Sequence, residues 1–507
     1  MQNKNVLLKV TNLRQYFPVG KKMFVKANDG ITLNIYEGET IGLVGESGCG
    51  KSTFGRTLLQ LYRQTDGRSI YYGASRDELS PVYVAKTVKN LTKLRSKMQE
   101  LQEKQAAKQA EYDAADEKQQ LLMHSELTAV CKEADDAYYD IASVIGGFMV
   151  AEDLHPVSQV YSKRCDATMR LKKAIEGRKP AKIDYDDAVF AASKENSKPS
   201  AAKTVEKTKA ALEAWDKKVD DARLAVQAVD EEIEALRAQY RSHPDFEKHE
   251  QMRDDGIDLA RLTYNEVRLI RNQLQYIFQD PYSSLNPRMT VANIVGEGMI
   301  AHKFFKKSDE RMHNEILRVM DNCGLAPYFL HRFPHQFSGG QRQRIGIARS
   351  LAVHPKFVVC DEAVSALDVS IQSQILNLLQ DLREQENLTY LFITHDLSVV
   401  KYISDRIGVM YLGNLVELAS SQEIFEHPLH PYTEALMESI PTTDVKKDLV
   451  VLEGDIPSPV NPPKGCKFHT RCKYCTEICS HVVPEWREVR PNHFVACHHT
   501  LEAQEQE

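Results

Sequence analysis

The chain has 507 residues, which predicts about two to four domains rather than one. Hydrophobic residues make up 42% and charged residues 27%, as in an ordinary soluble globular protein. The formal net charge is −6, so no overall basic field points to nucleic acid as a partner. The longest apolar stretch, residues 141–151, is far shorter than the ~20 residues of a membrane-spanning helix, and the first residues lack the apolar run of a secretory signal. We therefore expect a cytosolic chain that does not cross a membrane by itself.

Four segments differ in composition. Residues 1–80 and 251–440 alternate β-rich runs with helical patterns and glycine turns, which predicts an α/β fold with a parallel or mixed sheet. Residues 81–250 are rich in Ala, Lys, Glu, Asp and Gln, whereas residues 441–507 are rich in Pro, Gly, Cys and His. We expect an α/β core in two parts, a long helical insertion between them and a small cysteine-rich C-terminal region.

The insertion carries a heptad pattern. From Val205 to Tyr240 apolar residues recur every seven positions, and a second row runs beside them at an offset of three. Two such rows predict a coiled-coil helix roughly 54 Å long. A weaker pattern from Leu91 to Leu122 predicts its antiparallel partner, with residues 141–200 at the tip of a single hairpin. Prolines are expected to interrupt helices in that tip, at Pro156, Pro180 and Pro199. A loose helical bundle beside the core is the alternative.

A glycine-rich loop follows the predicted strand at residues 40–44. Residues 45–53 have the sequence Gly-Glu-Ser-Gly-Cys-Gly-Lys-Ser-Thr, and a helical pattern follows. Glycines let backbone N–H groups curl around phosphate oxygens, and the helix N-terminus adds positive potential. Lys51 can reach the β- and γ-phosphates, and the Ser52 hydroxyl can bind Mg²⁺. The predicted nucleotide-binding residues of this loop are Gly45, Ser47, Gly48, Cys49, Gly50, Lys51, Ser52 and Thr53.

A second apolar strand pattern, residues 356–360, ends in two carboxylates. Asp361 is placed to hold Mg²⁺, directly or through water, and Glu362 to orient or deprotonate an attacking water. A strand followed by Asp-Glu is a common pattern on its own. Together with the phosphate loop, it predicts hydrolysis of a nucleoside triphosphate.

Between these two elements lies another glycine turn, Phe-Ser-Gly-Gly-Gln at residues 337–341, which opens a helical pattern and suits a second phosphate contact. The three motifs in this order resemble those of ABC-transporter ATPases. The resemblance implies an ABC-type P-loop ATPase fold with a helical subdomain. It also implies a signature motif that contacts ATP through Ser338, Gly339, Gly340 and Gln341.

Other parts of the ABC ATPase pattern are matched singly. Gln279 resembles the Q-loop glutamine, which senses Mg²⁺ and contacts the transmembrane partner, and Asp368 lies in a segment similar to the D-loop. His395 resembles the switch histidine, and Phe17, beside Tyr16, stands where the family stacks an aromatic ring on adenine. The implied catalytic residues are Glu362, His395 and Gln279, and the implied Mg²⁺ ligands are Ser52, Gln279 and Asp361.

The same resemblance implies a mechanism. Two ATPase subunits close head to tail on ATP, each binding it between its own Walker A loop and the signature of the other, and hydrolysis reopens them. Ala363 follows Glu362 where relatives usually have proline. Both carboxylates are retained, so we expect activity to survive this difference.

Three stretches are similar to oligopeptide/dipeptide importer ATPases, namely residues 280–288, 427–433 and 456–472. The Ser-Ser-Leu-Asn-Pro-Arg sequence within the first is more like the F-type subunit, which pairs with a D-type homologue. The resemblance covers nearly everything except residues 81–250. It implies a peripheral ATPase on the cytoplasmic face of the cell membrane. Its partners would be a D-type subunit, two transmembrane permeases and, indirectly, an extracytoplasmic peptide-binding protein, with no nucleic acid.

Five of the ten cysteines lie between residues 466 and 497. Closely spaced thiolates in such a loop point to a metal site rather than to disulfides. In peptide-importer ATPases the corresponding cysteines hold a 4Fe–4S cluster, and the family spacing selects Cys466, Cys472, Cys479 and Cys497, which leaves Cys475 over. Our hypothesis is that the cluster has a structural role here, because no redox partner site is recognisable in the sequence. Zinc remains an alternative, because Cys472 and Cys475 form the closely spaced pair that zinc also favours. Free thiols without a metal are the third possibility.

Chromosome-maintenance and DNA-repair ATPases are the competing class, because they also carry a coiled coil between Walker A and the signature. Their Q-loop precedes the coil, whereas Gln279 follows it here, and neither Cys131 nor Cys165 belongs to a C-x2-C hook. A third interpretation is an adaptor with a vestigial ATPase, which the intact Lys51 and Glu362 oppose. For the insertion, our hypothesis is contact with a partner subunit or regulator. A tolerated surface insertion is the alternative.

Overall fold

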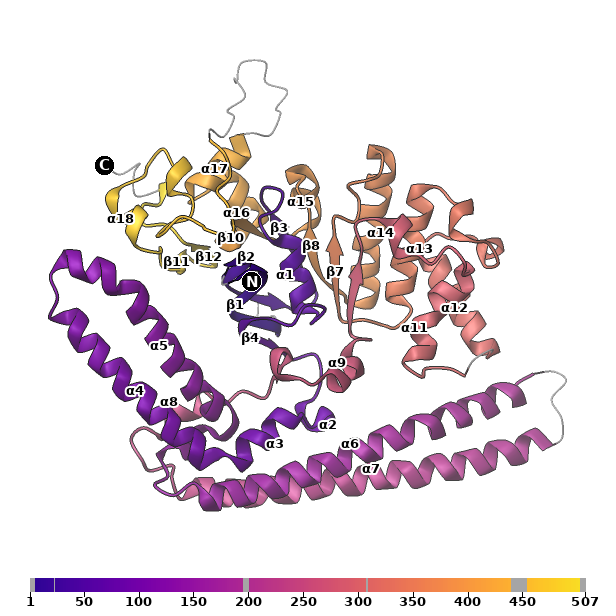
Figure 1. Cartoon of the computed structure of the whole chain (residues 1–507). Coiled ribbons are helices and arrows are strands. Elements are labelled where there is room, and N and C mark those ends of the chain that lie inside the picture. Colours follow the sequence, from indigo (N-terminus) through magenta and orange to yellow (C-terminus); the bar gives the residue numbers. More distant parts are fainter. Residues whose placement is uncertain (1–4, 22, 195–199, 307–308, 439–453, 502–507) are drawn as a thin grey trace.

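Two β-sheets form the core of the chain (Figure 1). The computed structural model describes residues 5–21, 23–194, 200–306, 309–438 and 454–501. The smaller sheet is antiparallel and consists of β1 (Val6–Gly20), β2 (Met23–Tyr36), β4 (Asp66–Tyr71) and β5 (Ile257–Asp258), in the order β2-β1-β4-β5. The insertion leaves the core after β4 and returns at β5, its direct neighbour. Its two ends therefore meet at one edge of this sheet.

The larger sheet contains β3 (Thr40–Val44), β6 (Leu274–Ile277), β7 (Phe357–Asp361), β8 (Thr389–Ile393), β9 (Arg406–Tyr411), β10 (Asn414–Ser420), β11 (Arg487–Arg490) and β12 (His493–Val495). Its order is β11-β12-β10-β9-β3-β8-β7-β6. The strands from β9 to β6 in this order are parallel, whereas β10, β12 and β11 are antiparallel additions. All residues of β3, β7, β8 and β9 are buried, as expected for parallel strands covered on both faces.

Helices cover this sheet and form a group of their own beside β6. Those of the core are α1 (Lys51–Leu58), α9 (Tyr264–Ile270), α10 (Pro281–Ser284), α11 (Val291–Ala301), α12 (Glu310–Asn322), α13 (Gly339–Leu351), α14 (Val369–Glu386), α15 (Leu397–Ile403), α16 (Ser421–Glu426) and α17 (Pro431–Glu438), with short 3₁₀ turns at Leu259–Arg261, Pro327–Phe329 and Pro334–Gln336. Helices α10 to α13 pack on one another, and α13 also contacts β6. One apolar cluster joins this helical subdomain to the parallel sheet.

The insertion consists of helices, as expected, but they form two hairpins and not one. They are α2 (Arg76–Leu79), α3 (Val82–Lys89), α4 (Leu91–Asp113), α5 (Glu117–Ile145), α6 (His155–Ala192), α7 (Ser200–Ala238) and α8 (Phe246–Glu250), with a 3₁₀ turn at Gly146–Val150. Helix α4 pairs with α5, and α6 pairs with α7. In the described ranges no helix combines the length and the apolar character needed to cross a membrane.

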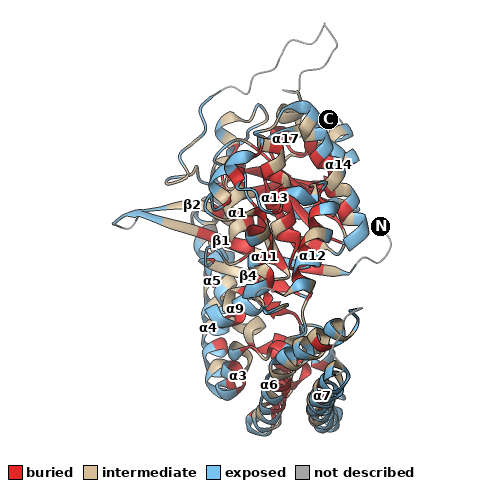
Figure 2. Cartoon of the chain, turned by 90° about the vertical axis from the view of Figure 1, so that its right-hand side faces the viewer, coloured by how far each residue is buried: buried red, intermediate tan, exposed pale blue. Residues whose placement is uncertain are grey.

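The predicted tip at residues 141–200 was therefore wrong. Most of that range is the long helix α6, which begins beside Pro156 and runs through Pro180, while Pro199 lies outside the described residues. The heptad row of α7 is buried at Leu212, Val219, Val226 and Ile233. Its partner surface on α6 alternates the small residues Ala167 and Ala174 with the large residues Leu171 and Ile175. A count of large apolar residues misses such a surface, and packing along α7 offsets the cost of a helical proline, about 3 kcal/mol. Buried residues are sparse on the outer faces of this hairpin (Figure 2).

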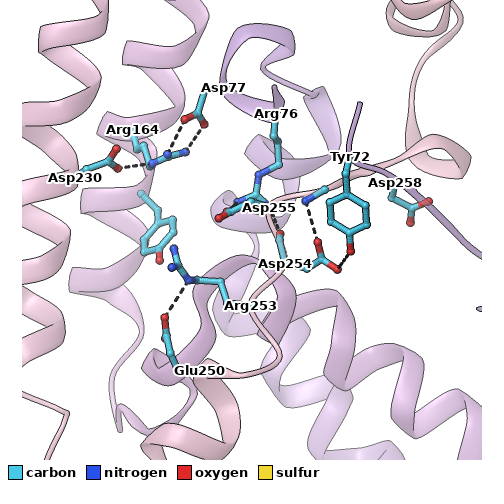
Figure 3. Close-up of polar contacts among 12 residues, drawn as sticks. Tyr72, Arg76, Asp77, Arg164, Asp230, Glu250, Arg253, Asp254, Asp255 and Asp258 are labelled. Atoms are coloured by element: carbon cyan, nitrogen blue, oxygen red, sulfur yellow. Dashed lines mark hydrogen bonds and ion pairs between the residues drawn. The ribbon is translucent and has the colours of Figure 1, made fainter. Parts of the chain in front are cut away.

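Ion pairs join the helices at the base of the insertion to one another and to the segment just before β5 (Figure 3). Arg164 of α6 binds both carboxylate oxygens of Asp77, at 2.7 and 3.0 Å, and Asp230 of α7 at 2.6 Å. Arg76 pairs with Asp255 at 2.8 Å, just before β5. These residues border a cavity of about 440 Å³ in which every arginine has a carboxylate partner, so we interpret it as a structural joint.

The C-terminal region is built onto the core sheet. It contains a 3₁₀ turn at His469–Arg471 and helix α18 (Glu477–His481). Strand β12 pairs with β10, and the buried His493 lies 2.6 Å from the buried carboxylate of Glu417. The region is therefore held to the core by a strand pairing and by a buried polar contact.

Candidate functional site

The phosphate loop between β3 and α1 requires its glycines. Gly45, Gly48 and Gly50 have positive φ angles of 147°, 79° and 103°. A Cβ atom on Gly45 would lie 2.2 Å from the carbonyl oxygen of Met410, and one on Gly50 would lie 2.0 Å from that of Ala27. The loop can therefore turn tightly at the N-terminus of α1, which is the arrangement that binds phosphate through backbone N–H groups.

Lys51 and Ser52 open α1 and point in different directions. The buried Lys51 donates from Nζ to the carbonyl oxygens of Gly45 (2.7 Å) and Glu46 (3.0 Å), so its ammonium group lies inside the loop. The Ser52 hydroxyl donates to Oδ1 of Asp361 at 2.6 Å. Two residues separated by more than 300 positions are thus in direct contact beside the phosphate loop.

Asp361 ends β7 and is completely buried. Besides Ser52, it accepts hydrogen bonds from the Tyr276 hydroxyl and from Nη2 of Arg56 at 3.3 Å. Burial, together with the neighbouring carboxylate, raises the pKa of Tyr276, which therefore stays a neutral donor. Sequence reasoning missed both residues. Arg56 could have been found, because it lies four positions after Ser52 and so shares its face of α1, but Tyr276 carries no motif signal.

The three predicted catalytic residues meet at Glu362. Gln279 donates from Nε2 to Oε2 of Glu362 at 2.6 Å, and Nδ1 of His395 lies 3.3 Å from Oε1. The Glu362 backbone has φ 46°, in the left-handed region, and its N–H donates to the carbonyl of Ile393 at 2.9 Å. Strained backbone of this kind is typical of functional sites. Gln279 contacts Glu362 and makes no hydrogen bond, among the described residues, to Ser52 or Asp361.

The predicted signature lies apart from the phosphate loop of the same chain. Ser338 caps α13 in a reciprocal pair with Gln341, and its side chain is exposed. Asp368 likewise caps α14, accepting from the N–H of Ile371 at 3.0 Å. Within the described ranges, residues 338–341 make no hydrogen bond to residues 45–53. Helices α1 and α13 also pack against different elements (Figure 1).

Phe17 lies beside the end of α1. Its ring meets that of Tyr62 edge to face, with centroids 5.2 Å apart. Tyr62 belongs to the segment that follows α1, so Phe17 lies beside that segment. The ring of Phe17 is only partly buried, so part of its surface is accessible to a ligand.

Four of the five C-terminal cysteines border one small cavity, and they are Cys466, Cys472, Cys479 and Cys497. Cys475 is exposed and does not line it. All four carry free thiols, and burial raises the pKa of Cys466 to about 11 and of Cys497 to about 12. Without a cation the thiols of Cys466 and Cys497 are therefore protonated at neutral pH.

The donor set suits a soft metal centre, because thiols and imidazoles supply most of the ligating groups among the residues that line the cavity. The enclosed space is about 10 Å³, so the thiols would have to move apart around a cluster. In the part of the chain that the structure describes, no three His, Cys, Asp or Glu side chains are already arranged around a metal position.

Comparison with known proteins places these sites in a family. The ABC transporter family profile matches residues 28–153 and 233–365, about half of the chain. The chain therefore belongs to the ABC transporter family, as an ATP-binding cassette with ATP-hydrolysing activity. A second profile, the oligopeptide/dipeptide transporter C-terminal region, matches residues 416–479.

Curated relatives agree with both profiles. The oligopeptide transport ATP-binding protein AppF of Bacillus subtilis is 51% identical over 250 residues, which cover 48% of this chain and 75% of AppF. The putative oligopeptide transport ATP-binding protein YkfD of the same organism is 34% identical over 496 residues, covering 97% of this chain and 95% of YkfD. OppF of Haemophilus influenzae is 47% identical over 246 residues, covering 48% of this chain and 74% of OppF.

Proposed function

We propose that this chain is the ATP-binding and ATP-hydrolysing F-type subunit of a membrane importer of oligopeptides or dipeptides. The observation that carries the proposal is the meeting of Gln279 and His395 at Glu362, directly beside Ser52 and the buried Asp361. The profile match of residues 416–479 supports peptides as the cargo. It also favours an importer over the DNA-repair alternative.

The residues divide the work of hydrolysis. Backbone N–H groups of residues 45–53 and the ammonium of Lys51 bind the phosphates. Ser52 and Asp361 hold Mg²⁺, whose charge offsets that of the phosphate oxygens when it is bound. Glu362 accepts the proton of the attacking water, while Gln279 and His395 keep its carboxylate in position.

The exposed signature supports a site shared between two subunits. Ser338 and Gly339 lie at the accessible start of α13 and Asp368 at the start of α14, away from the phosphate loop of the same chain. A head-to-tail pairing with a homologous D-type ATPase would place them against the nucleotide of that partner, with Phe17 of each chain beside its own adenine. Two permeases at the cytoplasmic membrane face, supplied by an extracytoplasmic peptide-binding protein, complete the proposed importer.

The proposal is tested with the assembled complex. The chain, its D-type partner and the two permeases are reconstituted in lipid vesicles, and phosphate release from Mg-ATP is measured. Peptide-loaded binding protein is expected to raise the rate, whereas duplex DNA is not. Stimulation by DNA, with none by the loaded binding protein, would favour the chromosome-maintenance class instead.

We also propose that Cys466, Cys472, Cys479 and Cys497 hold a 4Fe–4S cluster of structural role, with zinc as the alternative. The convergence of these thiols on one cavity supports this, as does the exclusion of Cys475 from it. Anaerobic purification should give a brown protein with visible absorption and bound iron. Cys475→Ser should keep both and Cys472→Ser should lose both. A colourless, iron-free protein loaded with zinc would contradict the cluster.

For the chain as a whole we propose four segments, at 1–80, 81–250, 251–440 and 441–507, the second being a coiled-coil insertion that contacts a partner subunit or regulator. Its long hairpin also reaches the helical subdomain, because Lys306 lies 2.6 Å from Asp184 and 2.9 Å from Asp187 of α6. Deletion of residues 81–250 is expected to lower peptide uptake. Normal assembly and uptake would indicate a tolerated surface insertion.

A further inference from the structure

The C-terminal region contacts the phosphate loop directly. Arg471 donates from its two terminal nitrogens to the two carboxylate oxygens of Glu46, at 2.9 and 3.1 Å, and its side chain is only 4% exposed. The backbone N–H of Glu46 donates to the hydroxyl of Tyr432 at 3.0 Å. A single residue of the loop is thus held at its side chain and at its backbone by residues 425 and 386 positions later in the chain.

The contact made by Arg471 comes from the segment between two of the clustered cysteines. Arg471 immediately precedes Cys472, and Lys467 immediately follows Cys466. The Lys467 ammonium pairs with Asp29 at 3.0 Å and donates to the carbonyl of Leu412 at 3.0 Å. The next residue, Gly413, donates its N–H to the carbonyl of Cys49 at 2.9 Å. Residues 466–472 therefore support the phosphate loop at two positions, Glu46 directly and Cys49 through the turn at residues 412–413.

The supported loop in turn holds Lys51. The Lys51 ammonium donates to the carbonyl oxygen of Glu46 at 3.0 Å. An arginine–carboxylate fork has a fixed, planar geometry, so it restricts both the position and the orientation of the group that it binds. Movement of Glu46 would therefore move one of the two carbonyls that position the ammonium group for the phosphates.

We propose that Arg471 is a positioning residue for the phosphate loop, and that the metal centre of the cysteine cavity keeps it in place. ATP affinity then depends on whether the four cysteines hold their metal. The second part rests on the proposed metal centre. The first part depends only on the contact between Arg471 and Glu46.

The contact is tested by a double-mutant cycle in the full-length, metal-loaded chain. Binding of a fluorescent ATP analogue is measured for Arg471→Gln, Glu46→Gln and the double variant. Loss of a buried charged hydrogen-bond pair predicts roughly ten- to hundred-fold weaker binding for Arg471→Gln. The double variant should bind no more weakly than Arg471→Gln, because both substitutions remove one contact. The KM for ATP should rise while kcat stays nearly unchanged, and Arg471→Lys should restore part of the affinity.

Lys473, on the other side of Cys472 from Arg471, provides the matched control. It carries the same charge next to Cys472, but it pairs with Glu434 of α17, at 3.0 Å, rather than with the phosphate loop. Lys473→Gln should leave ATP affinity unchanged. Visible absorption and iron content should equal those of the wild type in both Arg471→Gln and Lys473→Gln, which shows that the cavity is intact.

Removal of the metal tests the second part. A chelator, or Cys472→Ser, is expected to weaken ATP binding about as much as Arg471→Gln, with no further loss when the two changes are combined. Unchanged affinity in Arg471→Gln would overturn the positioning role. Weak binding in Arg471→Gln together with full affinity after metal removal would overturn the dependence on the metal. A chain that never contains metal would overturn that dependence too, while the double-mutant cycle would still decide the role of Arg471.

Discussion

Glu362→Gln should bind ATP as tightly as the wild type and hydrolyse it roughly 100- to 10,000-fold more slowly, the range expected for loss of a general base. Glutamine has the shape of glutamate but cannot accept a proton from water. Gln279 and His395 approach different oxygens of Glu362. Glutamine keeps one oxygen to accept the hydrogen bond from Gln279, and its amide N–H can face an unprotonated Nδ1 of His395, so the substitution is selective for loss of the base. Phosphate release at saturating Mg-ATP and equilibrium binding of labelled ATP measure the two effects separately.

Glu384→Gln is the control for this experiment. Glu384 lies on the exposed side of α14, so the same chemical change there should leave hydrolysis and binding at wild-type values. Wild-type turnover in Glu362→Gln would refute the assignment of the base. It would also remove the reason for placing Gln279 and His395 in catalytic roles.

Asp361→Asn is expected to raise the Mg²⁺ concentration needed for half-maximal ATPase activity by about 10- to 100-fold, as for other changes around protein metal sites. The substitution removes the negative charge next to Ser52. It also leaves the guanidinium of Arg56 without its carboxylate partner. One acceptor oxygen becomes an amide N–H donor, although the surrounding groups of Ser52, Tyr276 and Arg56 are donors too. A Mg²⁺ titration of phosphate release measures the first effect, and thermal unfolding measures any loss of stability.

Asp381→Asn, on the exposed face of α14, serves as the matched variant. Its Mg²⁺ dependence and melting temperature should equal those of the wild type. If Asp361→Asn also showed an unchanged Mg²⁺ dependence, the metal would have to be held elsewhere, and the contact between Ser52 and Asp361 would be purely structural.

Local motifs predicted the residue types of the nucleotide site and their order along the chain. Lys51, Ser52 and Glu362 belong to motifs of recognisable spacing, because a few neighbouring residues shape the backbone that positions each of these side chains. Arg56 and Tyr276 support Asp361 without belonging to such a pattern. The contact of Arg471 with Glu46 joins residues 425 positions apart, and no periodicity or motif records such a pairing.

The insertion shows a similar division. The heptad row predicted the buried face of α7. Residues spaced by seven positions lie on the same face of a helix, so the apolar row marks the face that packs against a partner, whichever partner that is. The partner itself was not predictable in this way. The apolar surface of α6 depends on small residues such as Ala167 and Ala174, and Pro180 lies inside the helix that it was expected to break. Packing of α6 against α7 outweighed the weak apolar pattern of α6 and the helix-breaking tendency of Pro180.

The most direct test of the proposed role is peptide uptake. Cells that lack the gene for this chain are given a labelled oligopeptide and supplied with the wild-type chain, Glu362→Gln or Glu384→Gln. Uptake should be lost on deletion, restored by the wild type and by Glu384→Gln, and not restored by Glu362→Gln. Full uptake without the chain, or with Glu362→Gln as its only form, would contradict an ATPase that powers peptide import.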